Sequence, residues 1–178
     1  MIRRAYTEYD PFPELDIVDQ HKLDTAEGLH MLGQYVDSAT EIARISPAGW
    51  NHPLVLHLAS RAYSALHRIP EALDCVERFI QAAPYHPFGY VFKGQMLEYS
   101  GKPKESYDLL CQVISHFPAH GTMHYELARV AAKCALWDEA RHWIYRAICI
   151  QHSLKIGALN TDALRPIRAE IEAMHPGN

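Results

Sequence analysis

The stretch Pro53–His86 reads PLVLHLASRAYSALHRIPEALDCVERFIQAAPYH, and Pro87–His120 follows it directly with the same plan. Both segments are 34 residues long, begin with Pro and end with Pro-x-His. The same period also gives the segments Gly121–Leu154 and Asp19–His52. Self-similarity at a fixed period is the signature of a repeat protein, so the period is the first evidence on the fold.

Two positions of the repeat hold a small residue in all four segments. The eighth is occupied by Ala26, Ser60, Gly94 and Ala128, and the twentieth by Ser38, Ala72, Ser106 and Ala140. Ala, Gly and Ser make up about a fifth of an average chain, so this agreement is not a product of composition. Helices can approach closely only where small side chains meet. Each repeat is therefore predicted to be a pair of antiparallel helices that touch at these two positions.

Larger apolar residues recur at the eleventh, twenty-fourth and twenty-seventh positions, for example Tyr63, Val76 and Phe79 in the second segment. The pattern resembles the tetratricopeptide repeat, and Pro84 and Pro118 stand at that family's proline position. The resemblance implies an all-α fold, a right-handed α-solenoid of helical hairpins. Repeats 53–86, 87–120 and 121–154 are clear. Repeat 19–52 is degenerate, because Lys22 and Thr25 replace apolar residues there.

The remaining segments flank the repeats, and the length of the chain predicts one domain. Residues 1–18 contain Pro11 and Pro13 and are expected to form an extended arm. The first helices are expected to end near Leu32, Leu66, Ser100 and Cys134, and the second near Ile45, Ala82, Phe117 and Gln151. Residues 155–178 are expected to form a turn and an amphipathic capping helix, in which Leu164, Ile167, Ile171 and Met174 share one face.

Composition excludes several functions and favours others. The net charge of −4, without a Lys/Arg run, gives no reason to expect nucleic acid as a partner. No segment approaches the roughly 20 apolar residues of a membrane span, and no signal peptide is evident. Cys75, Cys111, Cys134 and Cys149 are far apart and fall in predicted helices, which suits a reducing compartment. A cytoplasmic protein is expected.

The sequence holds little that points to catalysis or to a metal. Phosphate-binding, dinucleotide-binding, serine-hydrolase and zinc-protease motifs are absent from it. His116, His120 and His124 are spaced by four, but Pro118 and Gly121 interrupt any helix that would bring them together. His52, His86 and His120 share one loop position, where a capping role explains them. We expect no enzyme, no cofactor and no metal.

The resemblance also implies a binding surface, because the family points certain residues of each first helix into a concave groove. These residues, called the inner row here, are Leu54, His57, Arg61, Phe88, Val91, Gln95, Tyr99, Thr122, Tyr125, Arg129 and Lys133. Aromatic and basic side chains dominate the inner row, and Glu98 is the only acidic residue on the same face. This composition suits a peptide carrying acidic and apolar residues. The family's carboxylate-clamp residues are absent. The alternative is that some of the inner row packs against neighbouring elements or the arm.

The expected function is a protein-binding adaptor that takes up a peptide segment of a partner. One alternative is a dedicated secretion or assembly chaperone. Others are a helical regulatory subunit of an enzyme and a hydrolase that uses its histidines. A further hypothesis places the acidic and aromatic arm, Tyr6–Asp16, in the groove of its own or a second molecule, which would gate the groove or form a homodimer.

Overall fold

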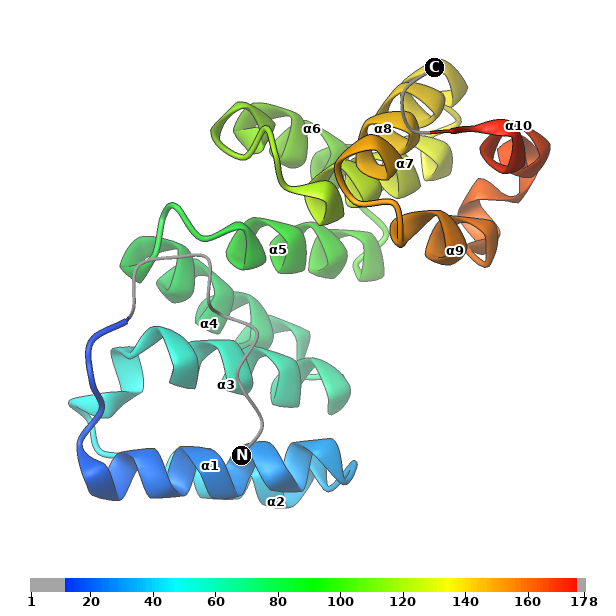
Figure 1. Cartoon of the computed structure of the whole chain (residues 1–178). Helices are drawn as coiled ribbons and strands as arrows, with labels where there is room; N and C mark the ends of the chain where they lie inside the picture. The colour runs from blue at the N-terminus through cyan, green and yellow to red at the C-terminus, as the bar shows by residue number, and fades with distance from the viewer. Residues whose placement is uncertain (1–11, 176–178) are drawn as a thin grey trace. The chain divides into compact units, whose positions relative to one another are not determined.

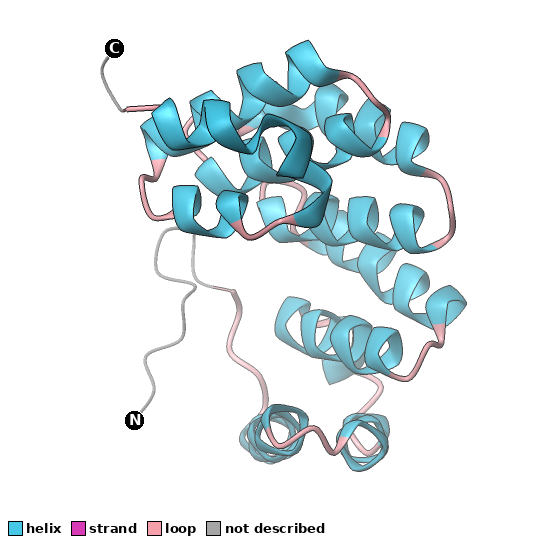
Figure 2. Cartoon of the chain, turned by 90° about the vertical axis from the view of Figure 1, so that its right-hand side faces the viewer, coloured by secondary structure: helices cyan, strands magenta, loops and turns pink. Residues whose placement is uncertain are grey.

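The structure is a computed structural model, and it describes residues 12–175. Within that range the chain consists of helices joined by loops and contains no strand (Figure 2). The chain divides into two compact units, residues 1–89 and 90–178. One domain was the expectation, but helical repeats contact mainly their neighbours, so contacts need not gather around one centre.

The first unit contains two helical hairpins (Figure 1). Its elements are α1 (Ile17–Met31), α2 (Tyr35–Ala43), the short 3₁₀ helix η1 (Gly49–Asn51), α3 (Pro53–Ala65) and α4 (Ile69–Ala82), followed by the first residues of α5 (Pro87–Tyr99). The elements of the second unit are the rest of α5, α6 (Pro103–Val113), η2 (Ile114–His116), α7 (Gly121–Lys133), α8 (Trp137–Ile150), α9 (Leu154–Leu159), η3 (Asp162–Ile167) and α10 (Arg168–Ala173).

Helix starts follow the period of the sequence. The second helices begin at Tyr35, Ile69, Pro103 and Trp137, at intervals of 34 residues. The all-α hairpin fold is thus confirmed. Two second helices end earlier than expected: α2 stops at Ala43, and α6 stops at Val113 before the tighter turn η2.

The eight small residues of the repeat are all buried. In the first hairpin, the Ser38 hydroxyl donates a hydrogen bond to the Ala26 carbonyl oxygen at 2.8 Å. Between α5 and α6, a Cβ atom on Gly94 would lie 3.0 Å from Ser106 Oγ. The helices therefore meet at these positions, as the pattern predicted.

Enlarging one of these small residues is expected to overpack a hairpin. Ala72→Leu or Ala140→Leu should lower the free energy of unfolding by roughly 1–3 kcal/mol, because neither side chain has any exposed surface. Urea denaturation measures the effect, and Ala43→Leu, at an exposed position of α2, is the matched control. If Ala72→Leu or Ala140→Leu unfolded at the same urea concentration as wild type, the helices would not pack closely at these residues.

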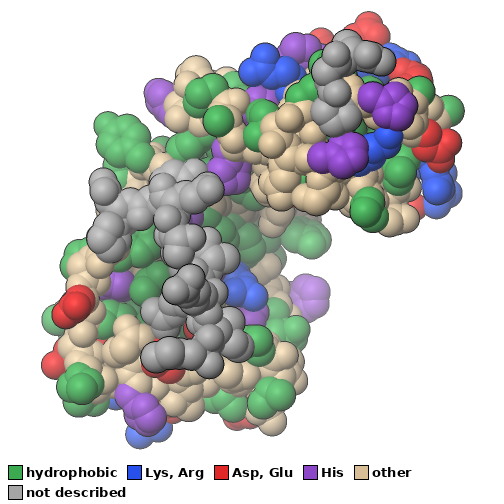
Figure 3. All heavy atoms as spheres, viewed as in Figure 1, with side chains coloured by type: hydrophobic (Ala, Val, Ile, Leu, Met, Phe, Trp, Pro, Cys, Tyr) green, Lys and Arg blue, Asp and Glu red, His purple; other side chains and the backbone are tan. Residues whose placement is uncertain are grey.

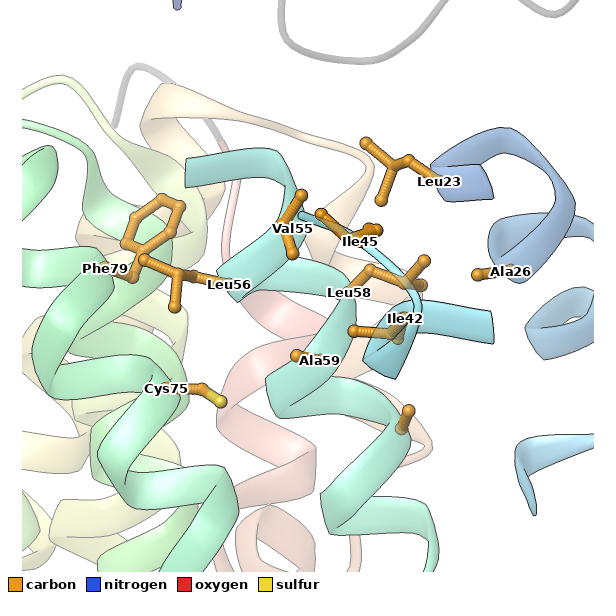
Figure 4. Packing of buried hydrophobic residues seen from close by; sticks show 11 residues of the cluster. Leu23, Ala26, Ile42, Ile45, Val55, Leu56, Leu58, Ala59, Cys75 and Phe79 are labelled. Atoms are coloured by element: carbon orange, nitrogen blue, oxygen red, sulfur yellow. The ribbon is translucent and has the colours of Figure 1, made fainter. Parts of the chain in front are cut away.

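The core of the first unit lies on both sides of α3. Figure 4 shows Leu56 directed toward Phe79 of α4, while Val55 and Leu58 lie near Ile45 and Ile42 of the first hairpin. All of these side chains are buried. At roughly 1.5–3 kcal/mol for each such side chain, this burial is the main force that holds the unit together.

The first repeat departs from the apolar pattern because one face of its first helix is exposed to solvent. Its third, sixth, seventh and tenth residues are His21, Asp24, Thr25 and Gly28, and all are exposed. The equivalent residues of α3 are Val55, Leu58, Ala59 and Ala62, and all are buried. The outer face of α1 is therefore polar where that of α3 is apolar, as expected of a terminal repeat.

Each hairpin turn contains one residue in the left-handed conformation. These residues are Gly33, His67, Gly101 and Ala135, with φ between 57° and 76°. The residue after each donates its N–H to a carbonyl of the first helix, for example Leu136 to Ala131 at 2.9 Å. This is the Schellman arrangement, which satisfies carbonyls at a helix end. Glycine suits this conformation at Gly33 and Gly101, whereas His and Ala rarely adopt it.

Ala135→Gly is therefore expected to stabilise the second unit by about 0.5–1 kcal/mol. Glycine relieves the strain of the left-handed conformation, and part of the gain is lost to the greater entropy of the unfolded chain. A denaturant titration beside Gly33→Ala, which should shift stability the other way, checks the prediction. A lowered midpoint for Ala135→Gly would count against the turn geometry.

A histidine stands directly before three of the first helices and caps each of them, as the shared loop position of these histidines suggested. Nδ1 of His52, His86 and His120 accepts a hydrogen bond from the backbone N–H of Leu54, Phe88 and Met123, at 3.2–3.3 Å. A side-chain acceptor at this position satisfies an N–H group that the helix itself leaves free. The capping interpretation is confirmed.

The C-terminal region differs from the single capping helix that was expected. Residues 154–173 form α9, η3 and α10, with Pro166 inside η3. Proline lacks an N–H and interrupts the longer helix. Leu164, Ile167 and Ile171 are nevertheless buried, packed against residues of α7 and α8 such as Ile144. Acidic and basic side chains lie side by side on the outside of this region (Figure 3).

Candidate binding surface

The inner row is divided between the two units, and its first part is packed into the core of the first. Leu54 and Phe88 are partly buried against the cluster around Leu56 and Phe79. The His57 ring meets the Phe88 ring edge-on, with 4.0 Å between their centroids. These three residues are thus largely structural, in line with the alternative that the sequence left open.

His57 is neutral at physiological pH. Desolvation lowers the pKa of this imidazole from 6.5 to about 3, and the nearby Arg61 guanidinium, His86 and His30 add to the effect. Desolvation, helped by Arg61, also lowers the pKa of His30. Of the inner-row residues in this unit, Arg61 is consequently the one that carries a positive charge.

The second part of the inner row contains a closed ionic network. Arg129 forms two hydrogen bonds with the carboxylate of Glu98, at 2.6 and 2.9 Å, and two more with Glu126. Lys133 Nζ lies 2.6 Å from Glu98 Oε2. Burial alone would lower the pKa of Arg129, but the two carboxylates outweigh it and raise that pKa. The two cations were expected to be available for an acidic ligand, and two carboxylates neutralise them instead.

Glu126 was the residue missed at the sequence level. It occupies the sixth position of its repeat, outside the inner row, and is 6% exposed. Gln95 Nε2 donates to Glu126 Oε1 at 3.1 Å, which ties α5 to α7. The signal was present, because Glu126 precedes Arg129 by three residues and such residues are neighbours on a helix surface.

A pocket of about 220 Å³ lies between α5 and α7. This pocket, called the α5–α7 pocket here, is lined by Gln95, Glu98, Tyr99, Arg129 and Lys133. Four of the five were in the predicted inner row. Tyr99 is 77% exposed, while the side chain of Glu98 is only 4% exposed. The exposed ring of Tyr99 thus lies beside buried polar groups that ion pairs hold in place.

The other inner-row residues of this unit are less accessible to a ligand. Val91 packs against the cluster that contains Leu110 and Phe117. The Tyr125 hydroxyl lies 2.5 Å from Thr161 Oγ1, so the segment between α9 and η3 lies against this tyrosine. Thr122 is half-buried at the start of α7. The structure therefore concentrates the accessible part of this surface at the α5–α7 pocket.

The arm falls partly outside the described residues, since Tyr6–Pro11 are not among them. Its described end packs on the first unit. The Phe12 ring lies 6.3 Å from the ring of Phe79 and 5.8 Å from that of His86, and Asp16 caps α1. The helix α1 begins at Ile17, within the stretch that was expected to be extended.

No metal site or membrane span is found in the described part of the chain. Among residues 12–175, no three His, Cys, Asp or Glu side chains converge as metal ligands would. No helix in the same range has the length and apolar character needed to cross a membrane.

Comparisons with known proteins bear on the fold. No family model and no curated protein matches the sequence. Solved structures do match: MamA from Desulfovibrio magneticus RS-1 has a TM-score of 0.66 at 14% identity, covering 90% of this chain and 94% of that one. A thermophilic TPR protein of Thermus thermophilus has a TM-score of 0.65 at 18% identity, covering 90% and 93%. These structures show that the chain has a TPR-like, all-α solenoid fold.

Proposed function

We propose that the chain is a non-enzymatic protein-interaction module that binds a peptide segment of a partner at the α5–α7 pocket. The observation that carries the proposal is the composition of this pocket: consecutive first helices supply an exposed tyrosine beside fixed polar groups. Helical solenoids commonly bind partners through such surfaces. The proposal assigns no catalytic group.

The hydrogen-bonding capacity of the pocket indicates what part of a peptide it would hold. Lys133 uses one of its N–H bonds on Glu98, and the ammonium group has two others. Gln95 uses one amide hydrogen on Glu126, and its amide oxygen remains as an acceptor. Because Glu98 and Glu126 already balance Arg129 and Lys133, a neutral peptide backbone fits better than a strongly charged segment. Tyr99 would pack against an apolar or aromatic side chain of that peptide.

Selection of displayed random dodecapeptides on the immobilised protein tests the proposal. Wild-type protein should enrich a peptide family, and Tyr99→Ala should weaken binding of the enriched peptides about tenfold, the loss expected for an aromatic contact at a binding surface. Tyr85→Ala is the matched control, since Tyr85 is 78% exposed and does not line the pocket. Equal binding by both variants would refute the pocket as the binding site. Binding that requires a whole folded partner would favour the regulatory-subunit alternative.

A further inference from the structure

A second, larger cavity lies in the first unit, away from the α5–α7 pocket. It has a volume of about 470 Å³. One wall is the segment 12–16, called the strap here, and the other is the turn from Ser46 to Pro53. Both walls lie at the same end of the first unit (Figure 1). Ala82, at the end of α4, also lines the cavity.

Hydrogen bonds hold the two walls in place. His52 Nε2 donates to the Pro13 carbonyl at 2.6 Å, while its Nδ1 caps α3, so one imidazole joins the strap to the turn. Asp19 Oδ1 accepts from the Ser46 N–H at 3.0 Å. A Cβ atom on Gly49 would lie 2.6 Å from Asp19 Oδ2, so the turn can approach this carboxylate only with glycine there. The cavity is therefore built into the unit before any ligand arrives.

The cavity is lined by apolar side chains and by acidic ones. Phe12, Leu15, Pro53 and Ala82 give the cavity apolar sides. Glu14, Asp16 and Asp19 line it too, and no Lys or Arg of the described part of the chain belongs to the lining. Hydrogen bonds from Ser46, joined by Lys22, lower the pKa of Asp19 to about 2, so this carboxylate is ionised.

Lys22 balances only one of the three carboxylates. Its Nζ lies 3.0 Å from Asp19 Oδ1 and also donates to the Arg44 carbonyl at 2.7 Å, which holds the ammonium group at Asp19. One carboxylate oxygen of Asp16 accepts a hydrogen bond from the Val18 N–H at 2.9 Å and so caps α1. Glu14 and Asp16 are both exposed. Among residues 12–175, no basic side chain pairs with Glu14 or Asp16, so these residues give the mouth of the cavity a net negative charge beside its apolar walls.

We propose that this cavity binds a lysine or arginine side chain from an exposed segment of a partner protein. The long apolar stem of such a side chain would lie along Phe12, Leu15 and Pro53, and its charged end would meet Glu14 and Asp16. A purely apolar group would desolvate the carboxylates without compensation, and an anion would be repelled. The volume lies in the range of sites that take up small ligands, so it has room for a long side chain.

Peptide display with four proteins tests this proposal separately from the proposed function. The variant Glu14→Gln/Asp16→Asn removes both mouth charges, and Asn at residue 16 keeps the oxygen that caps α1. The matched control Asp37→Asn/Glu139→Gln removes two exposed charges that do not line the cavity. The other two proteins are wild type and Tyr99→Ala. Random dodecapeptides are selected on wild type, and their affinities for all four proteins are measured.

We expect wild type to enrich peptides with a central Lys or Arg. The Glu14→Gln/Asp16→Asn variant should bind them about fivefold more weakly, the loss expected for two exposed ion pairs. The control and Tyr99→Ala should bind them as wild type does.

The proposal would be overturned if the control weakened binding as much as Glu14→Gln/Asp16→Asn does, or if wild type enriched no basic peptides. The selection is also repeated on a fifth protein, Arg3→Gln/Arg4→Gln. Basic peptides that are enriched only on this variant would overturn the proposal too, because the occupant would then be the chain's own N-terminal segment. Loss with Tyr99→Ala alone would assign the peptides to the α5–α7 pocket.

Discussion

Acidification from about pH 7 to about pH 4 is expected to lower the free energy of unfolding by about 3 kcal/mol through His57 alone. The folded protein keeps this imidazole neutral, with a pKa of about 3, while the unfolded chain takes up a proton near the ordinary value of 6.5. Between these values the unfolded state binds more protons. Stability is therefore complete above about pH 6.5 and falls by about 1.4 kcal/mol per pH unit below it.

The measurement compares the pH dependence of urea denaturation for wild type and His57→Gln. Glutamine does not titrate, so the two curves should converge as the pH falls, whatever the variant loses at neutral pH. His142→Gln is the control, because His142 is exposed. Parallel curves for wild type and His57→Gln would show that the aromatic cluster around Phe88 does not exclude water from this imidazole.

Glu98→Gln is expected to destabilise the second unit by about 3 kcal/mol. The Glu98 side chain is 4% exposed and pairs with both Arg129 and Lys133, so its loss leaves two neighbouring cations with one carboxylate, Glu126. Breaking a buried ion pair by removing one partner costs more than the pair contributes, because the other charge stays desolvated.

Urea denaturation with two companion variants checks this expectation. Glu105→Gln removes an exposed partner of Lys102 and should change stability by no more than about 0.5 kcal/mol. Adding Lys133→Gln to Glu98→Gln should restore part of the loss, since it removes one of the two unbalanced cations. A loss for Glu98→Gln no larger than that for Glu105→Gln would mean that solvent screens the network.

The fold was predictable because its main determinants are local and repeat along the chain. Residues such as Ala72 and Gly94 identify the helix contacts, and their period sets where the helices begin. The end of the chain was less predictable, because Pro166 is compatible with several local geometries and packing against α7 and α8 decides among them. The left-handed turns at His67 and Ala135 were not visible either, since neither residue type favours that conformation.

The α5–α7 pocket was predictable in position but not in charge. The resemblance placed Gln95, Tyr99, Arg129 and Lys133 on one surface, and they line one pocket. That Arg129 is neutralised depends on Glu126, whose side chain reaches the network from outside the inner row. A pattern of positions does not reveal such pairs, because they depend on side-chain conformation across two helices. The cytoplasmic location and the role of the arm stay predictions.

The identical turns have a consequence for how such a chain can change in length. Every hairpin turn has a left-handed residue at the same position of the repeat, and three successive first helices follow a histidine cap. A duplication or deletion that spans one whole period, such as residues 87–120, would join backbone ends that already have the matching conformation. Gene rearrangements of this size would need no new junction, whereas a gain or loss of a few residues inside a helix would misalign the small contact of that repeat.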